Sequence, residues 1–201
     1  MEHSLSVRAS AERTVALVNA LTGQGDTGTR PASPGSDPAS VPHPASVPDP
    51  DAIARVLLAH GEPAPVELTV DDVAEMNAAA VRLREVFAAP GLAAAATALN
   101  RLLGGGAGPL RLSSHGGRTA WHPHLDSDDE APWGEWLLGA SCLALTVLLW
   151  DHQRPPGGLC ASPACRNVFL TLGGGPPRRY CSRRCATRER VAAHRRAART
   201  A

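Results

Sequence analysis

Apolar residues recur at three- and four-residue spacing through most of the first 105 residues, which predicts a helical body. The pattern places helices over residues 10–22 and 52–60, a third beginning at Thr69, and a fourth over 92–103. Ser10 and Asp51 are the expected caps of the first two helices, and Gly61 is the expected end of the second. In the third, Asp71 and Asp72 follow Thr69, where their charge favours the helix N-terminus.

Two later segments have a different pattern. Residues 109–113 and 118–122 alternate polar and apolar positions around a turn at 114–117, which predicts two short paired strands. Residues 136–150 contain no charged side chain. A bilayer core needs about 20 helical residues, so this run is too short to span one. We therefore expect a central, fully buried helix, with no membrane as partner.

Residues 23–50 are rich in Gly, Pro, Ser, Thr and Asp and include two similar hexapeptides, PASVPH and PASVPD. Such a segment has too little apolar surface to offset the entropy of ordering. It predicts a flexible, disordered loop, with a recognition peptide as the alternative.

The charge is divided unevenly along the chain. Residues 1–153 hold 9 Arg and 18 acidic residues, a net charge of −9. Residues 154–201 hold 11 Arg and one acidic residue, a net charge of +10. We therefore expect an N-terminal domain over residues 1–153 and a C-terminal module over 154–201 that attracts phosphate polymers.

Four cysteines in the C-terminal module have the spacing C-x4-C-x15-C-x3-C, which is typical of a zinc site. The expected metal ligands are Cys160, Cys165, Cys181 and Cys185. Because cysteine would fill all four positions, one structural Zn²⁺ is expected, with disulfides or free thiols as the alternatives. The N-terminal residues show no export signal, so a cytoplasmic location is expected. Cys142 lies in the apolar run and is interpreted as a small buried side chain.

The order of these segments, with Leu17-Val18-Asn19 in the first helix and a four-cysteine tail, resembles the bacterial CGNR zinc-finger proteins. In the tail, Cys160 and Cys165 precede the apolar stretch 168–170, and Arg178-Arg179-Tyr180 precedes Cys181. The family's Cys-Gly-Asn-Arg is Cys185-Ala186-Thr187-Arg188 here. The resemblance implies an N-terminal ABATE domain, described as a stress-induced transcription regulator, and a finger that binds DNA.

The tail itself predicts a treble-clef-like finger. Residues 168–170 and 178–180 are expected to pair as a hairpin, with residues 173–176 in its turn. A helix is expected from Cys185 to about Arg199, with arginines along one face. The arginines expected to contact DNA are Arg178, Arg179, Arg183, Arg184, Arg188, Arg195 and Arg196.

Together these observations predict a mainly α (α+β) fold, with a helical N-terminal domain, a small β-hairpin and the finger. The expected function is a zinc-finger DNA-binding transcription regulator that dimerises or binds an effector. The alternative is a zinc-dependent interaction module for RNA or an acidic protein. The sequence contains no nucleophile elbow or phosphate-binding glycine loop, so no enzyme is expected. His122 and His124, near Asp126 and Asp129, suggest either a second metal centre or, the favoured interpretation, a polar loop.

Overall fold

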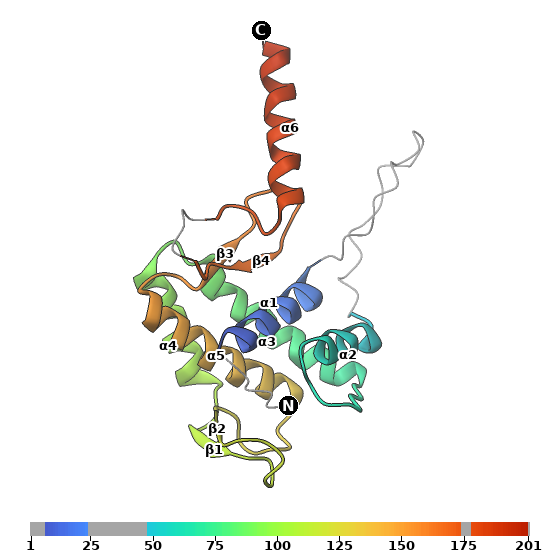
Figure 1. The fold of residues 1–201 in the computed structure, drawn as a ribbon, viewed down its shortest axis with the longest axis vertical. Coiled ribbons are helices and arrows are strands. Elements are labelled where there is room, and N and C mark those ends of the chain that lie inside the picture. The colour runs from blue at the N-terminus through green and yellow to red at the C-terminus, as the bar shows by residue number, and fades with distance from the viewer. Residues whose placement is uncertain (1–6, 24–47, 174–177, 201) are drawn as a thin grey trace.

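The computed structural model describes residues 7–23, 48–173 and 178–200, and these form six helices and two small antiparallel sheets. Figure 1 shows helices α1 to α5 gathered into one body, with the β1–β2 hairpin at one end and α6 projecting from the other. The elements, in chain order, are α1 Val7–Thr22, α2 Pro50–Ala59, α3 Val70–Ala88, α4 Leu92–Gly105, β1 Arg111–Ser113, β2 His122–His124, α5 Trp133–His152, β3 Gly157–Leu159, β4 Val168–Leu170 and α6 Arg183–Thr200. Most of the predicted loop 23–50 and of the predicted turn 173–176 lies outside the described residues.

The starts of the first two helices differ from the predicted ones. Ser10 lies inside α1, where its carbonyl oxygen accepts a hydrogen bond from Thr14 Oγ1 at 2.9 Å, so it is not a cap. Asp49, not Asp51, caps α2, because its side chain accepts the backbone N–H of Asp51. Pro50 occupies the first turn, where the missing N–H costs nothing.

Helix α3 runs through the centre of the body, and its predicted start is confirmed. Thr69 and Asp72 form a capping box, in which each side chain accepts a hydrogen bond from the other residue's backbone N–H. One face of α3 is buried against α1, α4 and α5 and carries the predicted apolar stripe. This face includes Val73, Met76, Ala80, Leu83 and Phe87.

Helix α5 is apolar around its whole circumference, but it is not fully buried as the sequence suggested. Within the described residues it alone has the length and composition of a membrane-spanning helix, and half of its most apolar stretch is buried inside the body. Leu145 and Cys142 are inaccessible to solvent, whereas Trp150 is 70% exposed. Burial raises the pKa of the Cys142 thiol to about 12, as expected for a cysteine that serves as packing.

The predicted β1–β2 hairpin exists, but its second strand is shifted. β2 comprises His122–His124 instead of residues 118–122, so Ser113 pairs with His122 and Arg111 with His124. Leu112 and Trp121, two apolar positions of the predicted alternation, are 65% and 72% exposed. Ser113 and His124 are buried instead, and thus the hairpin is held by polar contacts.

Strand β4 connects the tail to the body. Val168 and Leu170 belong to the same apolar core as residues of α1 and α3. The side chain of Asn19 in α1 forms two hydrogen bonds with the backbone of Val168. The finger is therefore docked on the helices through β4, whereas α6 extends beyond them (Figure 1).

Candidate metal centre

The first pair of cysteines lies in the tight connection between β3 and β4. These strands pair antiparallel, with Leu159 opposite Val168. Within the connection, the N–H of Cys160 donates to the carbonyl oxygen of Asn167 at 2.9 Å, and that of Cys165 donates to Ser162 at 2.9 Å. This folding brings Cys160 and Cys165 to the same end of the hairpin.

The hairpin pairing corrects the sequence prediction. β4 pairs with β3 and not with residues 178–180, which form no strand. The pairing depends on Gly157, since a Cβ atom there would lie 1.9 Å from the carbonyl oxygen of Phe169. The segment before Cys181 instead reaches the connection through one bond, from Ala161 N–H to the carbonyl oxygen of Arg179 at 2.8 Å.

The second pair of cysteines lies at the start of α6, as predicted. Cys185 is in the first turn, and Cys181 precedes the helix by two residues. Ser182 fixes this turn, because its Oγ accepts the N–H of Cys185 at 3.2 Å and its carbonyl oxygen accepts that of Ala186 at 3.1 Å. The two thiols are therefore presented on one side of the helix start.

The four sulfur atoms converge as a tetrahedral metal site requires. All lie within 4.8 Å of one another, and Cys181 Sγ is 3.7 Å from both Cys165 Sγ and Cys185 Sγ. Zn–S bonds of about 2.3 Å in a tetrahedron place sulfurs roughly 3.7 Å apart. Among the described residues no disulfide joins these cysteines. The residues fit one zinc ion with a closed set of sulfur ligands, which makes its role structural.

The surroundings of Cys160 favour its thiolate. Burial opposes the charged form, but hydrogen bonds from the backbone of Cys181 and Ser162 and from the thiols of Cys181 and Cys165 together outweigh it, so the pKa of Cys160 is lowered. The Cys181 N–H lies 3.5 Å from Cys160 Sγ. Burial raises the pKa of Cys181 to about 12, and the adjacent thiols add to this effect. The metal therefore supplies the positive charge that holds all four groups as thiolates.

One acidic side chain secures α6 to the cysteine connection. Ser162 is 1% exposed, and its Oγ donates to Glu189 Oε1 at 2.6 Å. Glu189 is the single acidic residue after Arg154 in the sequence. This contact, which the sequence did not indicate, ties the second turn of the helix to the finger.

Two of the arginines expected at a DNA interface make contacts inside the finger. Arg178 donates to the carbonyl oxygen of Cys181 at 2.7 Å and lies over the ring of Phe169 at 5.3 Å. Arg179 lies 5.8 Å from the ring of Tyr180. The other five, all exposed, are on α6: Arg183, Arg184, Arg188, Arg195 and Arg196.

A hollow of about 830 Å³ lies between the finger, the base of α6 and the start of α1. Its arginines come from three separate parts of the chain and include two that the sequence did not single out, Arg8 and Arg166. The others are Arg178, Arg184 and Arg188. Glu12 also lines the hollow and pairs with Arg8 at 2.9 Å. The hollow is therefore rich in guanidinium groups.

Comparison with known proteins supports the metal assignment. Residues 158–198 match the sequence profile of the CGNR zinc finger, a span that contains all four cysteines and nearly all of α6. No curated protein matches the chain. The fold class is as predicted, with a mainly helical body and a zinc finger, and the cofactor is one structural zinc ion.

Proposed function

We propose that this protein is a DNA-binding transcription regulator whose zinc finger carries the contact with the duplex. The observation that carries this proposal is the position of α6, which projects away from the helical body (Figure 1). From Arg190 to Arg199 only Ala192 is even partly buried. A cationic helix that is exposed on nearly all sides suits insertion into a groove of nucleic acid.

The arginines of α6 favour one face. Arg184, Arg188, Arg195 and Arg199 fall within about 60° of one another around an ideal helix. The first two also line the hollow beside α1. The proposed phosphate-binding surface therefore runs from the hollow along this face. Arg196 lies about 60° beyond its edge, whereas Arg183 lies about 100° from Arg184 at the helix start. Arg178 and Arg179, held against aromatic rings, support the helix start as well as adding charge.

The charge balance of the finger favours a polyanion even with the metal bound. Four thiolates and one Zn²⁺ contribute −2, which lowers the charge of residues 154–201 from +10 to +8. Glu189, the one acidic residue of this segment, already accepts a hydrogen bond from Ser162. The body, at −9, would be repelled by DNA, so contact is confined to the finger and the adjoining hollow.

The N-terminal body supplies regulation in this proposal. The resemblance to ABATE-containing proteins favours a stress-responsive role for residues 1–153, with a cytoplasmic location and a homodimer or an effector as further parts of the hypothesis. No catalytic role is proposed for it.

The direct test is binding of the full, zinc-loaded chain to labelled fragments of its parent genome at several salt concentrations. Duplex DNA is compared with RNA of the same sequence and with an acidic peptide. Arg184→Ala with Arg188→Ala should reduce duplex binding at least tenfold while zinc content stays at one ion in the finger. The matched control, Arg55→Ala with Arg101→Ala, removes two exposed arginines of the body and should leave binding unchanged. Preference for RNA or for the peptide would overturn the proposal in favour of an interaction module.

A further inference from the structure

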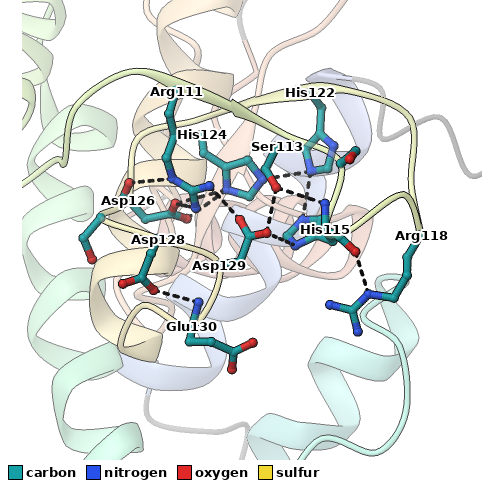
Figure 2. Close-up of polar contacts among 12 residues, drawn as sticks. Arg111, Ser113, His115, Arg118, His122, His124, Asp126, Asp128, Asp129 and Glu130 are labelled. Carbon is teal, nitrogen blue, oxygen red and sulfur yellow. Dashed lines mark hydrogen bonds and ion pairs between the residues drawn. The ribbon is translucent and has the colours of Figure 1, made fainter.

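Three imidazole rings meet at the β1–β2 hairpin, at the end of the body opposite α6 (Figure 1, Figure 2). His122 and His124 belong to β2, and His115 comes from the connection that precedes it. His122 Nε2 is 3.3 Å from His115 Nε2 and 3.0 Å from His124 Nε2. The sequence pointed to His122 and His124 but missed His115, because the strand shift that brings it close was not foreseen.

The opposite nitrogen of each ring faces an oxygen acceptor. His124 Nδ1 lies 3.0 Å from Asp126 Oδ2, and His122 Nδ1 lies 2.8 Å from the carbonyl oxygen of Ala120. His115 Nδ1 lies 3.5 Å from Asp129 Oδ2. These acceptors favour the tautomer with hydrogen on Nδ1, which leaves the Nε2 lone pairs of His115 and His124 facing that of His122.

Lone pairs that face one another repel unless a positive charge lies between them. Tetrahedral Zn–N bonds of 2.0–2.1 Å place ligand nitrogens about 3.3 Å apart. The two measured Nε2 separations, 3.3 and 3.0 Å, are close to this value, and the ligand atoms of all three residues lie within 4.8 Å of one another. The cluster thus has the spacing of a preformed three-nitrogen site.

Two carboxylates lie beside the rings. Asp126, 2% exposed, and Asp129 both pair with Arg111, and Arg118 donates to the carbonyl oxygen of His115 at 2.8 Å. Ser113 Oγ donates to Asp129 Oδ2 at 2.7 Å and so fixes the carboxylate that faces His115. These carboxylates occupy the outer positions that orient metal-bound imidazoles in proteins, as Figure 2 shows.

We propose that His115, His122 and His124 bind a second zinc ion through their Nε2 atoms. Three protein ligands leave a fourth position for water or for an exchangeable ligand, because His115 and His122 are only half-buried. Imidazole ligands also suit Cu²⁺ and Ni²⁺, so these metals compete in the same test. This site is separate from the four-cysteine centre in both position and ligand chemistry.

The test begins with the full chain, saturated with Zn²⁺ and then desalted, whose metal content is measured by mass spectrometry. We expect two zinc ions in the wild type and one in both His122→Gln and His115→Gln. His152→Gln, which alters an exposed histidine at the end of α5, is the matched control and should keep two. Thermal unfolding in excess chelator identifies any variant that has lost its fold.

Cobalt substitution distinguishes the two sites. Co²⁺ in the four-cysteine centre gives sulfur-to-metal charge-transfer absorption, whereas Co²⁺ bound only by imidazoles gives ligand-field bands without it. His122→Gln should weaken the second, sulfur-free binding event at least 100-fold and leave the first unchanged. A single metal per wild-type chain, or a second metal that both histidine variants retain, would overturn the proposal and leave the cluster as a polar contact.

Discussion

The side-chain amide of Asn19 forms the two backbone hydrogen bonds with Val168 that a neighbouring strand would otherwise form. Its Nδ2 donates to the carbonyl oxygen of Val168 at 3.1 Å, and its Oδ1 accepts the Val168 N–H at 2.7 Å. The two residues are 149 positions apart, so this pair joins the first helix directly to the strand that follows the cysteine connection. Both polar groups of one β4 residue are thus satisfied by the body.

Replacing Asn19 should loosen that junction. Asn19→Ala leaves two backbone groups of Val168 without their protein partners, and we expect it to lower the free energy of unfolding by about 1–3 kcal/mol. Asn100→Ala, in an exposed position of α4, is the control and should change it little. Urea unfolding followed by circular dichroism measures both. Equal stability of the two variants would contradict a structural role for the pair.

Removal of zinc should unfold the finger before the body. In a closed four-cysteine site the metal-binding free energy is folding free energy for the segment it organises. A strong chelator, or Cys181→Ser, should therefore increase amide hydrogen exchange throughout α6 and leave the exchange of α3 near that of the native protein. Cys142→Ala, which alters a thiol outside the cluster, should retain the metal. Simultaneous loss of α3 protection would show that the body depends on the metal as well.

The contact between Ser162 and Glu189 should control how tightly the base of α6 is held. Ser162→Ala removes the hydroxyl donor of a bond to a charged group, which costs about 1.5–3 kcal/mol. We expect a faster release of zinc to a colorimetric chelator and faster exchange in the first two turns of α6. Glu189→Gln keeps an acceptor and should have a smaller effect. Faster release in Glu189→Gln than in Ser162→Ala would contradict this assignment.

The proposed DNA contact predicts a defined salt dependence. Each phosphate neutralised by an arginine adds about 0.9 to the steepness of the plot of log affinity against log salt concentration. Arg188→Ala should reduce the slope by roughly 0.9 and weaken binding similarly for all duplex sequences. Arg55→Ala should leave the slope unchanged. A slope that stays constant in Arg188→Ala would place Arg188 outside the contact.

The Arg13–Glu62 pair gives the body a pH-dependent component of stability. Arg13 is 6% exposed, lies over the ring of Trp136 at 4.6 Å, and bonds to Glu62 at 3.1 Å. Burial raises the pKa of Glu62 above its ordinary value of 4.5, and the charge of Arg13 opposes this only in part. The folded state then holds the Glu62 proton to a higher pH than the unfolded state does.

It follows that the Glu62 contribution to stability is complete below pH 4.5 and declines as the pH rises through the elevated pKa. Glu62→Gln cannot titrate and should show a flatter dependence over that interval. Urea unfolding of both proteins at several pH values measures the difference. A wild-type curve that rises relative to Glu62→Gln with increasing pH would reverse the assigned direction.

The sequence predicted several features that depend on neighbouring residues. It placed the start of α3 at Thr69 with Asp72 in the first turn, where the structure has a capping box, and the cysteines of each pair are separated by three or four residues. Thiolate chemistry restricts such spacings strongly, so the four ligands could be identified before the fold was known.

The features that it missed depend on pairing between distant segments. Gly157 and Gly158 have little intrinsic preference for a strand, yet β3 forms because it can approach β4 closely at Gly157. The displaced second strand of the other hairpin likewise concealed the approach of His115 to His122. The start of α2 was missed for a local reason, because the sequence pattern favoured Asp51 as its cap, whereas Asp49 is the cap and Pro50 lies in the first helical turn.

Because Val168 and Leu170 contribute side chains to the interior formed by α1 and α3, cleavage of the chain near residue 154 followed by separation would expose apolar surface on both fragments. The finger would lose its packing contact with α1 and α3, and these helices would lose the part of their apolar core that β4 supplies. A movement within α1 or α3 would also reach the cysteine connection next to this inserted strand, and from there the base of α6 through the bond between Ser162 and Glu189.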